Sequence, residues 1–439
     1  MSDWLNQAIA DGESLQVSRS QNSNDWLSEK RQSSLALLKD SAWPNRKIEA
    51  WKYTPVRALE NAKVSRVLSN SGFGSRDAVN DEPSLLDSAT VIDNVDLIDV
   101  TILDAQLTTI LSKQNLPKGL AIKSFDELDE AEKDIVRENF SSIKPSKHLF
   151  GLVNDVLANT CIFIDVEDDV KIENPVRILN VVSGGCEVHV RVFVRVGNNA
   201  KLTLIEQFSG IEQSVNTCFS EYSVGASAEL EHYRFGLQTN SAVALGGNHF
   251  YLSERSKMNS TIVGFGSDLS RLDVDVIHGG ENALAKINAI FLLKDDELFD
   301  LHTTIEHAVP NGITEENVRG IVADQAKAVF NGRIHIHRHA QKTLAELNNR
   351  NLLLSEKAEV NTKPELEIYA DDVKCAHGAT IAEIDKKALY YLQSRGISPE
   401  QAKIMLNFGF INELVDFIPN KAIAEWLRPQ LRERFSKMQ

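Results

Sequence analysis

Two stretches of sequence, VGNNAKLTLIEQ at residues 196–207 and VGASAELEHYRF at residues 224–235, are similar when they are aligned end to end. Ala200 aligns with Ala228, and Leu202 aligns with Leu230. A repeat at this spacing is typical of a solenoid, in which each unit buries its apolar face on the next. We therefore predict a right-handed parallel β-helix. A β-sandwich would also supply many strands, but it predicts no repeat.

The sequence on both sides of the repeat is rich in alternating apolar residues. EVHVRVFVRV, residues 187–196, places its valines on one face of a strand, as expected for a half-buried strand. We predict that the β-helix core spans residues 161–384. Residues 1–160 are predicted to form an N-terminal helical and mixed domain with a flexible segment near 61–90. Residues 385–439 are predicted to form a C-terminal helical domain.

Composition limits the classes of partner and compartment. The chain has 439 residues and a formal net charge of −15, which argues against nucleic acid as the main partner. The N-terminal sequence MSDWLNQAIADGESLQ lacks an apolar core, and no apolar run approaches the ~20 residues of a membrane helix. Cys161, Cys186, Cys218 and Cys375 lie far apart and form no CxxC motif, which suits a reducing compartment. We expect a cytoplasmic protein.

The sequence lacks the motifs of several common enzyme classes. It has no GxxxxGK[ST] phosphate loop, no GxSxG elbow and no HExxH zinc motif. Any nucleotide chemistry must therefore come from another chain. Some β-helices are polysaccharide lyases or hydrolases, but such enzymes need a groove of clustered carboxylates, and the sequence contains no such cluster.

One short motif could bind a metal. DDVKCAHGAT, residues 371–380, places Cys375 and His377 on the same face of a strand, because alternate side chains point the same way. Thiolate and imidazole both suit iron and zinc. Two ligands are fewer than the about four that such sites use. The pair is therefore either structural or half of a site that another subunit completes.

Three histidines alternate in RIHIHRHAQ, residues 333–341. His335, His337 and His339 would share one face of a strand, where they could hold zinc or iron. The other interpretation is a solvated strand face, with Ile334 and Ile336 pointing inward. No carboxylate or thiol is placed nearby in the sequence to complete a metal shell, which favours the solvated face.

The C-terminal region contains an apolar helical stripe. SPEQAKIMLNFGFINELVDFIP, residues 398–419, begins with Ser398 as a helix cap and Pro399 at the first helical position. The end of a solenoid needs a cap, so part of this stripe must be core, and the remainder could dock a partner. The candidate docking residues are Met405, Phe408, Ile411, Leu414 and Val415.

Two blocks of the sequence resemble a known family. NNRNLLLSEKAEVNTKPELEIYADDVKCAHGATIAEID at residues 348–385, followed by YLQSRGIS, is similar to the C-terminal signature of the SufB/SufD family of iron–sulfur cluster assembly proteins. KIEAWKYT at residues 47–54 resembles the N-terminal signature of the same family. The similarity runs from roughly residue 30 to residue 420. The KCAHGAT context and the few cysteines resemble the SufD branch.

The resemblance implies a role in a complex. In that family SufB and SufD form a heterodimer, and each binds one SufC ATPase through its C-terminal helical region. The complex builds nascent iron–sulfur clusters, and the SufD branch supports iron acquisition without catalytic activity of its own. By position, His377 is the histidine implicated at the interface with SufB, where it would hold metal transiently, and Cys375 lies in the same motif. No stably bound cofactor is expected. A structural homodimer with no direct role in the cluster is the alternative.

Overall fold

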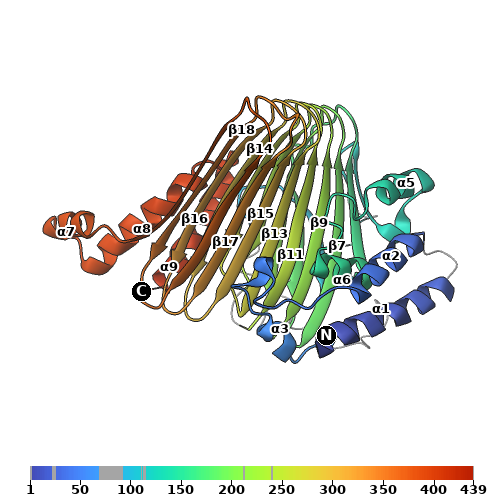
Figure 1. Cartoon of the computed structure of the whole chain (residues 1–439), viewed down its shortest axis with the longest axis horizontal. Coiled ribbons are helices and arrows are strands. Elements are labelled where there is room, and N and C mark those ends of the chain that lie inside the picture. Colours follow the sequence, from blue (N-terminus) through green and yellow to red (C-terminus); the bar gives the residue numbers. More distant parts are fainter. Residues whose placement is uncertain are drawn as a thin grey trace.

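The computed structural model describes residues 2–21, 26–68, 92–109, 111, 115–210, 213–238 and 241–438. Two long sheets of parallel strands face each other, and the chain alternates between them, so that each coil adds one strand to each sheet (Figure 1). The fold is thus the predicted parallel β-helix, flanked by helices from the N-terminal and C-terminal parts of the chain (Figure 1).

We call the two sheets sheet A and sheet B. Sheet A contains β4 (Leu120–Ser124), β5 (Thr160–Val166), β7 (Cys186–Val196), β9 (Val215–Val224), β11 (Val243–Leu252), β13 (Leu269–His278), β15 (Leu298–His307), β17 (Lys327–Ile336) and β19 (Glu359–Ile368). Sheet B contains β3 (Gln106–Leu107), β2 (Ile98–Leu103), β6 (Val176–Val182), β8 (Lys201–Gly210), β10 (Glu229–Gly236), β12 (Lys257–Gly264), β14 (Leu284–Leu293), β16 (Ile313–Val322), β18 (Leu344–Leu353) and β20 (Lys374–Glu383). The short strand β1 (Ser65–Arg66) pairs with β7.

The register of sheet B follows the sequence repeat. Glu229 of β10 pairs with Lys201 of β8, and Lys257 of β12 pairs with Glu229, so each coil here advances by the same spacing as the repeat. From β8 to β18, a residue in the left-handed conformation precedes each strand of sheet B by two positions, such as Asn199 with φ of 55° and Ser227 with φ of 57°. The intervening residue is small and buried in both cases, because the chain reverses its direction tightly at this corner.

Strand β7 is buried on both of its faces. Its valines point into the coil and are buried, as the alternation predicted. However, the outward residues His189, Arg191 and Phe193 are buried as well. Helix α6 (Leu149–Leu157), all of whose residues are buried, packs against β7, β9 and β11, and Phe193 lies in a separate apolar cluster with Phe125 and Phe140. This part of sheet A is therefore covered on its outer face as well as on its inner face.

The part of the chain that precedes β5 combines helices with the first strands of both sheets. Its helical elements are α1 (Asp3–Gln21), α2 (Ser28–Lys39), η1 (Glu49–Trp51), α3 (Arg57–Asn61), η4 (Phe125–Glu127), α5 (Glu130–Asn139) and α6. Helices α1 and α2 lie beside α6 and the early strands of sheet A (Figure 1). Of the segment near 61–90 that was predicted to be flexible, residues 69–90 lie outside the described residues.

The chain ends in α7 (Lys386–Ser394), α8 (Pro399–Val415) and α9 (Lys421–Ser436). The Ser398 side chain caps α8 as predicted, because its hydroxyl accepts a hydrogen bond from the Gln401 backbone N–H at 3.2 Å. Helices α8 and α9 pack against the outer face of sheet B, whereas α7 extends away from the body of the molecule (Figure 1). Within the described ranges, no helix has both the length and the apolar character needed to cross a membrane.

Candidate functional site

The coil ends in two open sheet edges. β19 is the last strand of sheet A and β20 is the last strand of sheet B, and among the described residues nothing pairs with their outer edges. Backbone hydrogen bonds alternate in direction along a strand. The backbone N–H groups of Glu359 and Tyr369 donate hydrogen bonds to Ala326 and Ile336, in or next to β17. The even-numbered residues of β19 therefore direct their backbone N–H groups to the free edge. Pro364 is one of these residues and has no N–H to offer.

Cys375 and His377 lie on β20 in the column of side chains that lines the inside of the coil. In the register of the two strands, Cys375 lies beside Ala345 and His377 lies beside Leu347. Ala345 and Leu347 are both buried core residues of β18. No later coil covers β20 in the described structure, so His377 is exposed and Cys375 is half-buried. The coil therefore presents these two side chains at its open end.

The environment of Cys375 keeps its thiol protonated. Partial burial, only weakly opposed by the Ala345 backbone, raises the pKa of Cys375 above its ordinary value. A bound metal or a positive charge from another chain would be needed to favour the thiolate, which is the metal-binding form. No group of three or more His, Cys, Asp and Glu side chains in the described part of the chain is placed to hold a metal ion. Cys375 and His377 can therefore provide at most part of a metal site.

The three alternating histidines lie one coil earlier, at the end of β17 and in the turn that follows it. Ile334 and Ile336 are fully buried, so the histidines face outward, as the solvated-face interpretation predicted. His335 Nδ1 lies 2.9 Å from a carboxylate oxygen of Glu367, and His337 contacts Glu306. His339 lies in the turn after β17 and is exposed. These carboxylates were not recognised from the sequence because they come from neighbouring coils.

The remaining cysteines are buried and unreactive. Cys161, Cys186 and Cys218 are free thiols with almost no exposed surface. Burial raises the pKa of Cys161, and it raises the pKa of Cys218 to about 12. A thiol with so high a pKa is protonated at neutral pH and is therefore a poor nucleophile. Of the four cysteines, Cys375 alone is accessible.

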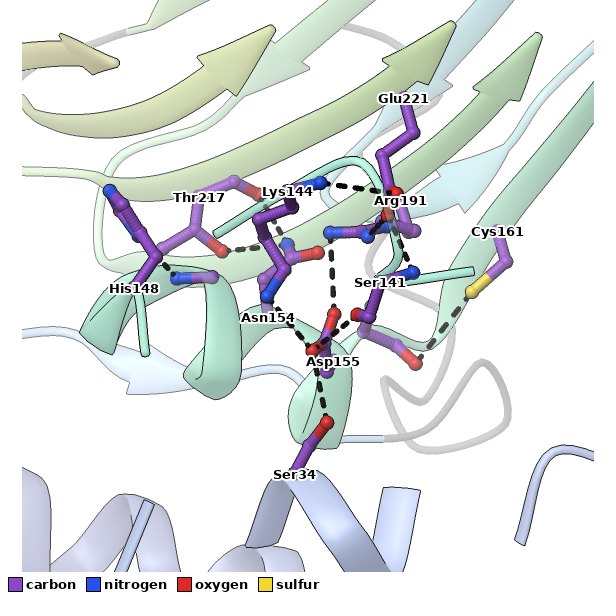
Figure 2. A network of polar contacts seen from close by, with 12 residues as sticks. Ser34, Ser141, Lys144, His148, Asn154, Asp155, Cys161, Arg191, Thr217 and Glu221 are labelled. Carbon is purple, nitrogen blue, oxygen red and sulfur yellow. Dashed lines mark hydrogen bonds and ion pairs between the residues drawn. The ribbon is translucent and has the colours of Figure 1, made fainter. Parts of the chain in front are cut away.

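A buried polar network joins the N-terminal helices to sheet A (Figure 2). Asp155 of α6 lies 3.2 Å from Lys144 Nζ and 3.3 Å from Arg191 Nη1, and it accepts hydrogen bonds from Ser34 and Ser141. Arg191 also pairs with Glu221 of β9. Burial alone would raise the pKa of Asp155, but the charges of Lys144 and Arg191 outweigh it and hold this pKa below its ordinary value.

This network was missed at the level of sequence. Its members come from α2, from the loop before α6, from α6 itself and from two strands, so no local motif links them. Each charge is matched by an opposite charge within the network, and a bound ligand is not needed to balance it. Such a network fixes the N-terminal helices on sheet A, because separating them would leave buried charges unpaired.

The candidate docking stripe on α8 divides into two parts. Ile411, Leu414 and Val415 are fully buried in an apolar cluster against sheet B, so they are not accessible to another protein. The prediction that these three residues dock a partner is wrong for this conformation, because they pack against the outer face of sheet B. Met405 is 54% exposed, and Phe408 is half-buried at the edge of the same cluster.

Helix α7 adds an exposed aromatic surface beside α8. None of its residues is buried, and Tyr390 and Tyr391 are strongly exposed. No docking role was predicted for these tyrosines, although two adjacent aromatic residues close to the α8 stripe in the sequence were a usable signal. Met405 on α8 and Phe417 directly after α8 are further exposed apolar side chains of this region.

Comparison with known proteins places the chain in a family. Residues 180–410 match the model described as "SUF system FeS cluster assembly, SufBD core domain", and residues 13–178 match the SufBD N-terminal region. The iron–sulfur cluster assembly protein SufD of Escherichia coli is 29% identical over 92% of each chain. A SufBD family protein of Synechocystis is 28% identical over 92% of this chain and 90% of its own. SufD of Bacillus subtilis is 23% identical over 92% of each chain. The chain therefore belongs to the SufB/SufD family of iron–sulfur cluster assembly proteins.

Proposed function

We propose that this chain is a SufD-type subunit that supports iron–sulfur cluster assembly at an interface with a SufB-type partner. The observation that carries the proposal is the open end of the coil, where two unpaired sheet edges and an accessible Cys–His pair occur together in the described structure. The proposed subunit has no catalytic activity of its own. Iron and the nascent cluster are cargo that the complex handles.

The free edges of β19 and β20 suit pairing with strands of another chain. Unpaired N–H and C=O groups on an edge strand are a template for such pairing. Large apolar side chains are also exposed on these strands or directly after them, namely Ile368 at 41%, Tyr369 at 61% and Ile381 at 46%. A partner strand along each edge would continue the two sheets and cover these side chains.

Pairing at this end would enclose Cys375 and His377 between two subunits. The imidazole of His377 is accessible, and imidazole binds ferrous iron as well as zinc. The partner would then supply the remaining ligands, since the described part of this chain offers no third one at hand. A metal held in this way is shared and can leave when the subunits separate.

The C-terminal helices are the proposed docking site for a SufC-type ATPase. Tyr390, Tyr391 and Met405 are exposed on these helices and Phe408 is half-buried, whereas the deeper part of the α8 stripe holds the helices on sheet B. This division allows α7 to bind a partner without loss of the core. The chain itself has no phosphate-loop motif, so nucleotide hydrolysis belongs to that partner.

The test is anaerobic reconstitution of the complex of this chain with its SufB-type and SufC-type partners. His377→Ala should leave assembly intact, because one side chain rarely decides a large interface. Cluster formation, followed by visible absorption, should fall severalfold. His339→Ala is the matched control, since His339 is also exposed in the last coils but lies outside the Cys–His pair.

Two outcomes would contradict the proposal. If His377→Ala and His339→Ala both gave the wild-type yield of cluster, His377 would have no part in assembly. If the chain formed only a homodimer and did not bind the SufB-type partner, the structural alternative would replace the proposal.

A further inference from the structure

A short N-terminal segment is fastened to the outer face of sheet A by a buried ion cluster. We call this segment, residues 49–54, the strap. Arg271 Nη1 donates a hydrogen bond to the Ala50 carbonyl at 2.6 Å, and its guanidinium lies 3.9 Å from the ring centroid of Trp51. Thr54 donates a hydrogen bond of 2.6 Å to Asp300, which also accepts one from Arg271 at 2.8 Å.

The strap reaches the last strand of sheet A. Glu49 pairs with Lys363 of β19 at 2.9 Å. The strap, β17, β19 and Ile381 of β20 together line a pocket of about 410 Å³. This pocket therefore lies beside the same open edge that the proposed function assigns to the SufB-type partner.

The pocket has a mixed lining. Val329, Val360 and Ile381 are apolar, Glu49, Lys52 and Lys363 are charged, and Tyr53 of the strap is 42% exposed. Lys52 lies at the rim, 5.1 Å from the ring centroid of Tyr53, and forms none of the ion pairs found among the described residues. The exposed ring of Tyr53 beside the ammonium of Lys52 suits a large apolar side chain that is followed or preceded by a carboxylate.

We propose that the strap pocket is a second contact for the partner subunit, in addition to strand pairing at β19 and β20. This inference rests on the proposed function, because the occupant is the chain that pairs with those edges. A strand along β19 would run about 4.8 Å from it, so its side chains would reach the pocket. The partner inserts an apolar side chain against Tyr53 and presents a carboxylate to Lys52.

The buried ion cluster gives this contact a physical rationale. The side chains of Arg271 and Asp300 are 4% and 0% exposed, so the strap is held firmly whether or not a partner is bound. A binding surface that is already ordered does not lose conformational entropy on association, and its contacts contribute fully to affinity. The strap thus acts as a preformed wall of the partner site.

The experiment measures the affinity of the full-length chain for the purified SufB-type and SufC-type partners. The double variant Lys52→Glu/Tyr53→Ala should bind at least about tenfold more weakly. Lys52→Glu alone, at an exposed position, should also weaken binding and serves if the double variant folds poorly. Lys47→Glu is the matched control: it makes the same charge change in the same part of the chain, but Lys47 does not line the pocket.

A variant at the sheet edge separates this inference from the proposed function. The backbone N–H of Lys374 donates to Thr343 next to β18, so the odd-numbered residues of β20, Ala379 among them, direct their N–H groups to the free edge. Ala379→Pro therefore removes a donor from this edge without removing a hydrogen bond to β18. If Ala379→Pro weakens binding and the strap variants do not, the inference is overturned and the proposed function stands. If neither change weakens binding, the proposed function fails.

A crosslinking experiment identifies the occupant. With Tyr53 replaced by benzoylphenylalanine, illumination of the assembled complex should join this chain to the SufB-type subunit. A crosslinked homodimer, or no crosslink from an assembled complex, would overturn the inference.

Discussion

Lys144 Nζ lies 3.2 Å from Asp155 Oδ2, and the side chains of both residues are completely buried. This ion pair links the loop before α6 to α6 itself, within the network that holds the N-terminal helices on sheet A (Figure 2). Because a buried charge is stable only when it is paired, the relationship makes the attachment of these helices sensitive to single substitutions and to acid.

We predict that Lys144→Met destabilises the chain by about 3 kcal/mol, because it leaves Asp155 without one of its two buried cations. Because the pKa of Asp155 in the folded chain lies below its ordinary value near 3.8, the ionised carboxylate stabilises the folded state at pH values above about 3.8. This stabilisation is lost as the pH falls from that value through the lower pKa of the folded state. In the variant that loss should begin at a higher pH. Chemical unfolding at several pH values measures both effects.

Lys437→Met is the control for this prediction. It removes an exposed pair with Glu433, and a change below about 0.5 kcal/mol is expected. Equal effects of the two substitutions would show that the buried pair has no special role in stability.

We predict that Glu316→Gln stabilises the chain in alkaline solution. Glu316 is buried inside the coil, and this burial, opposed only by the Thr303 hydroxyl, raises its pKa to about 7. The folded state then binds a proton more tightly than the unfolded chain, so stability declines as the pH rises from about 4.5 to 7. The variant should gain on the order of 1–3 kcal/mol at pH 8 and little at about pH 4.

Glu315→Gln provides the comparison for Glu316. Glu315 is the neighbouring residue, but it is partly exposed and pairs with Lys286 at 2.8 Å. Its substitution should leave the pH dependence of unfolding unchanged. If the free energy of unfolding of the wild-type chain does not decline between pH 5 and 8, Glu316 does not carry an unpaired charge in the folded state at the upper end of this range.

We predict that substitutions on α7 and α8 separate docking from folding. Tyr390→Ala/Tyr391→Ala should leave the melting temperature nearly unchanged, because no residue of α7 is buried, and should weaken binding of the SufC-type ATPase at least about tenfold. Ile411→Ala should instead destabilise the chain by about 2–5 kcal/mol, because Ile411 is fully buried. Calorimetry and a binding assay on the same samples make the comparison. Unchanged ATPase binding by the tyrosine variant would place the docking surface elsewhere.

The fold could be predicted because its repeat is local and regular. Ala200 and Ala228 mark equivalent corners, and the pairing of Lys201 with Glu229 follows the same spacing that the sequence displays. Burial on the outer face of sheet A could not be predicted in this way. It depends on α6, which is sequentially remote from strands such as β9 and β11 and leaves no period in their sequences.

The candidate site was predictable only in part. The alternation of β20 places Cys375 and His377 in one column, but it does not say that the coil ends there and leaves them accessible. The α8 stripe shows the opposite difficulty. Ile411 and Met405 belong to the same apolar pattern, yet one is buried in this chain's own core and the other is exposed, since hydrophobic periodicity cannot tell an internal contact from an external one.

The proline on β19 bears on how the subunit behaves when it is synthesised in excess. An orphan copy displays two sheet edges that unrelated strands could extend, which is the usual origin of aggregation in β proteins. Pro364 interrupts the row of donors on one of these edges, and the charged residues Lys363 and Glu365 flank it. These residues act as a safeguard against misassembly on β19. If the proposed partner pairs with β20, matched production of the two subunits would cover that edge before it can recruit a foreign strand.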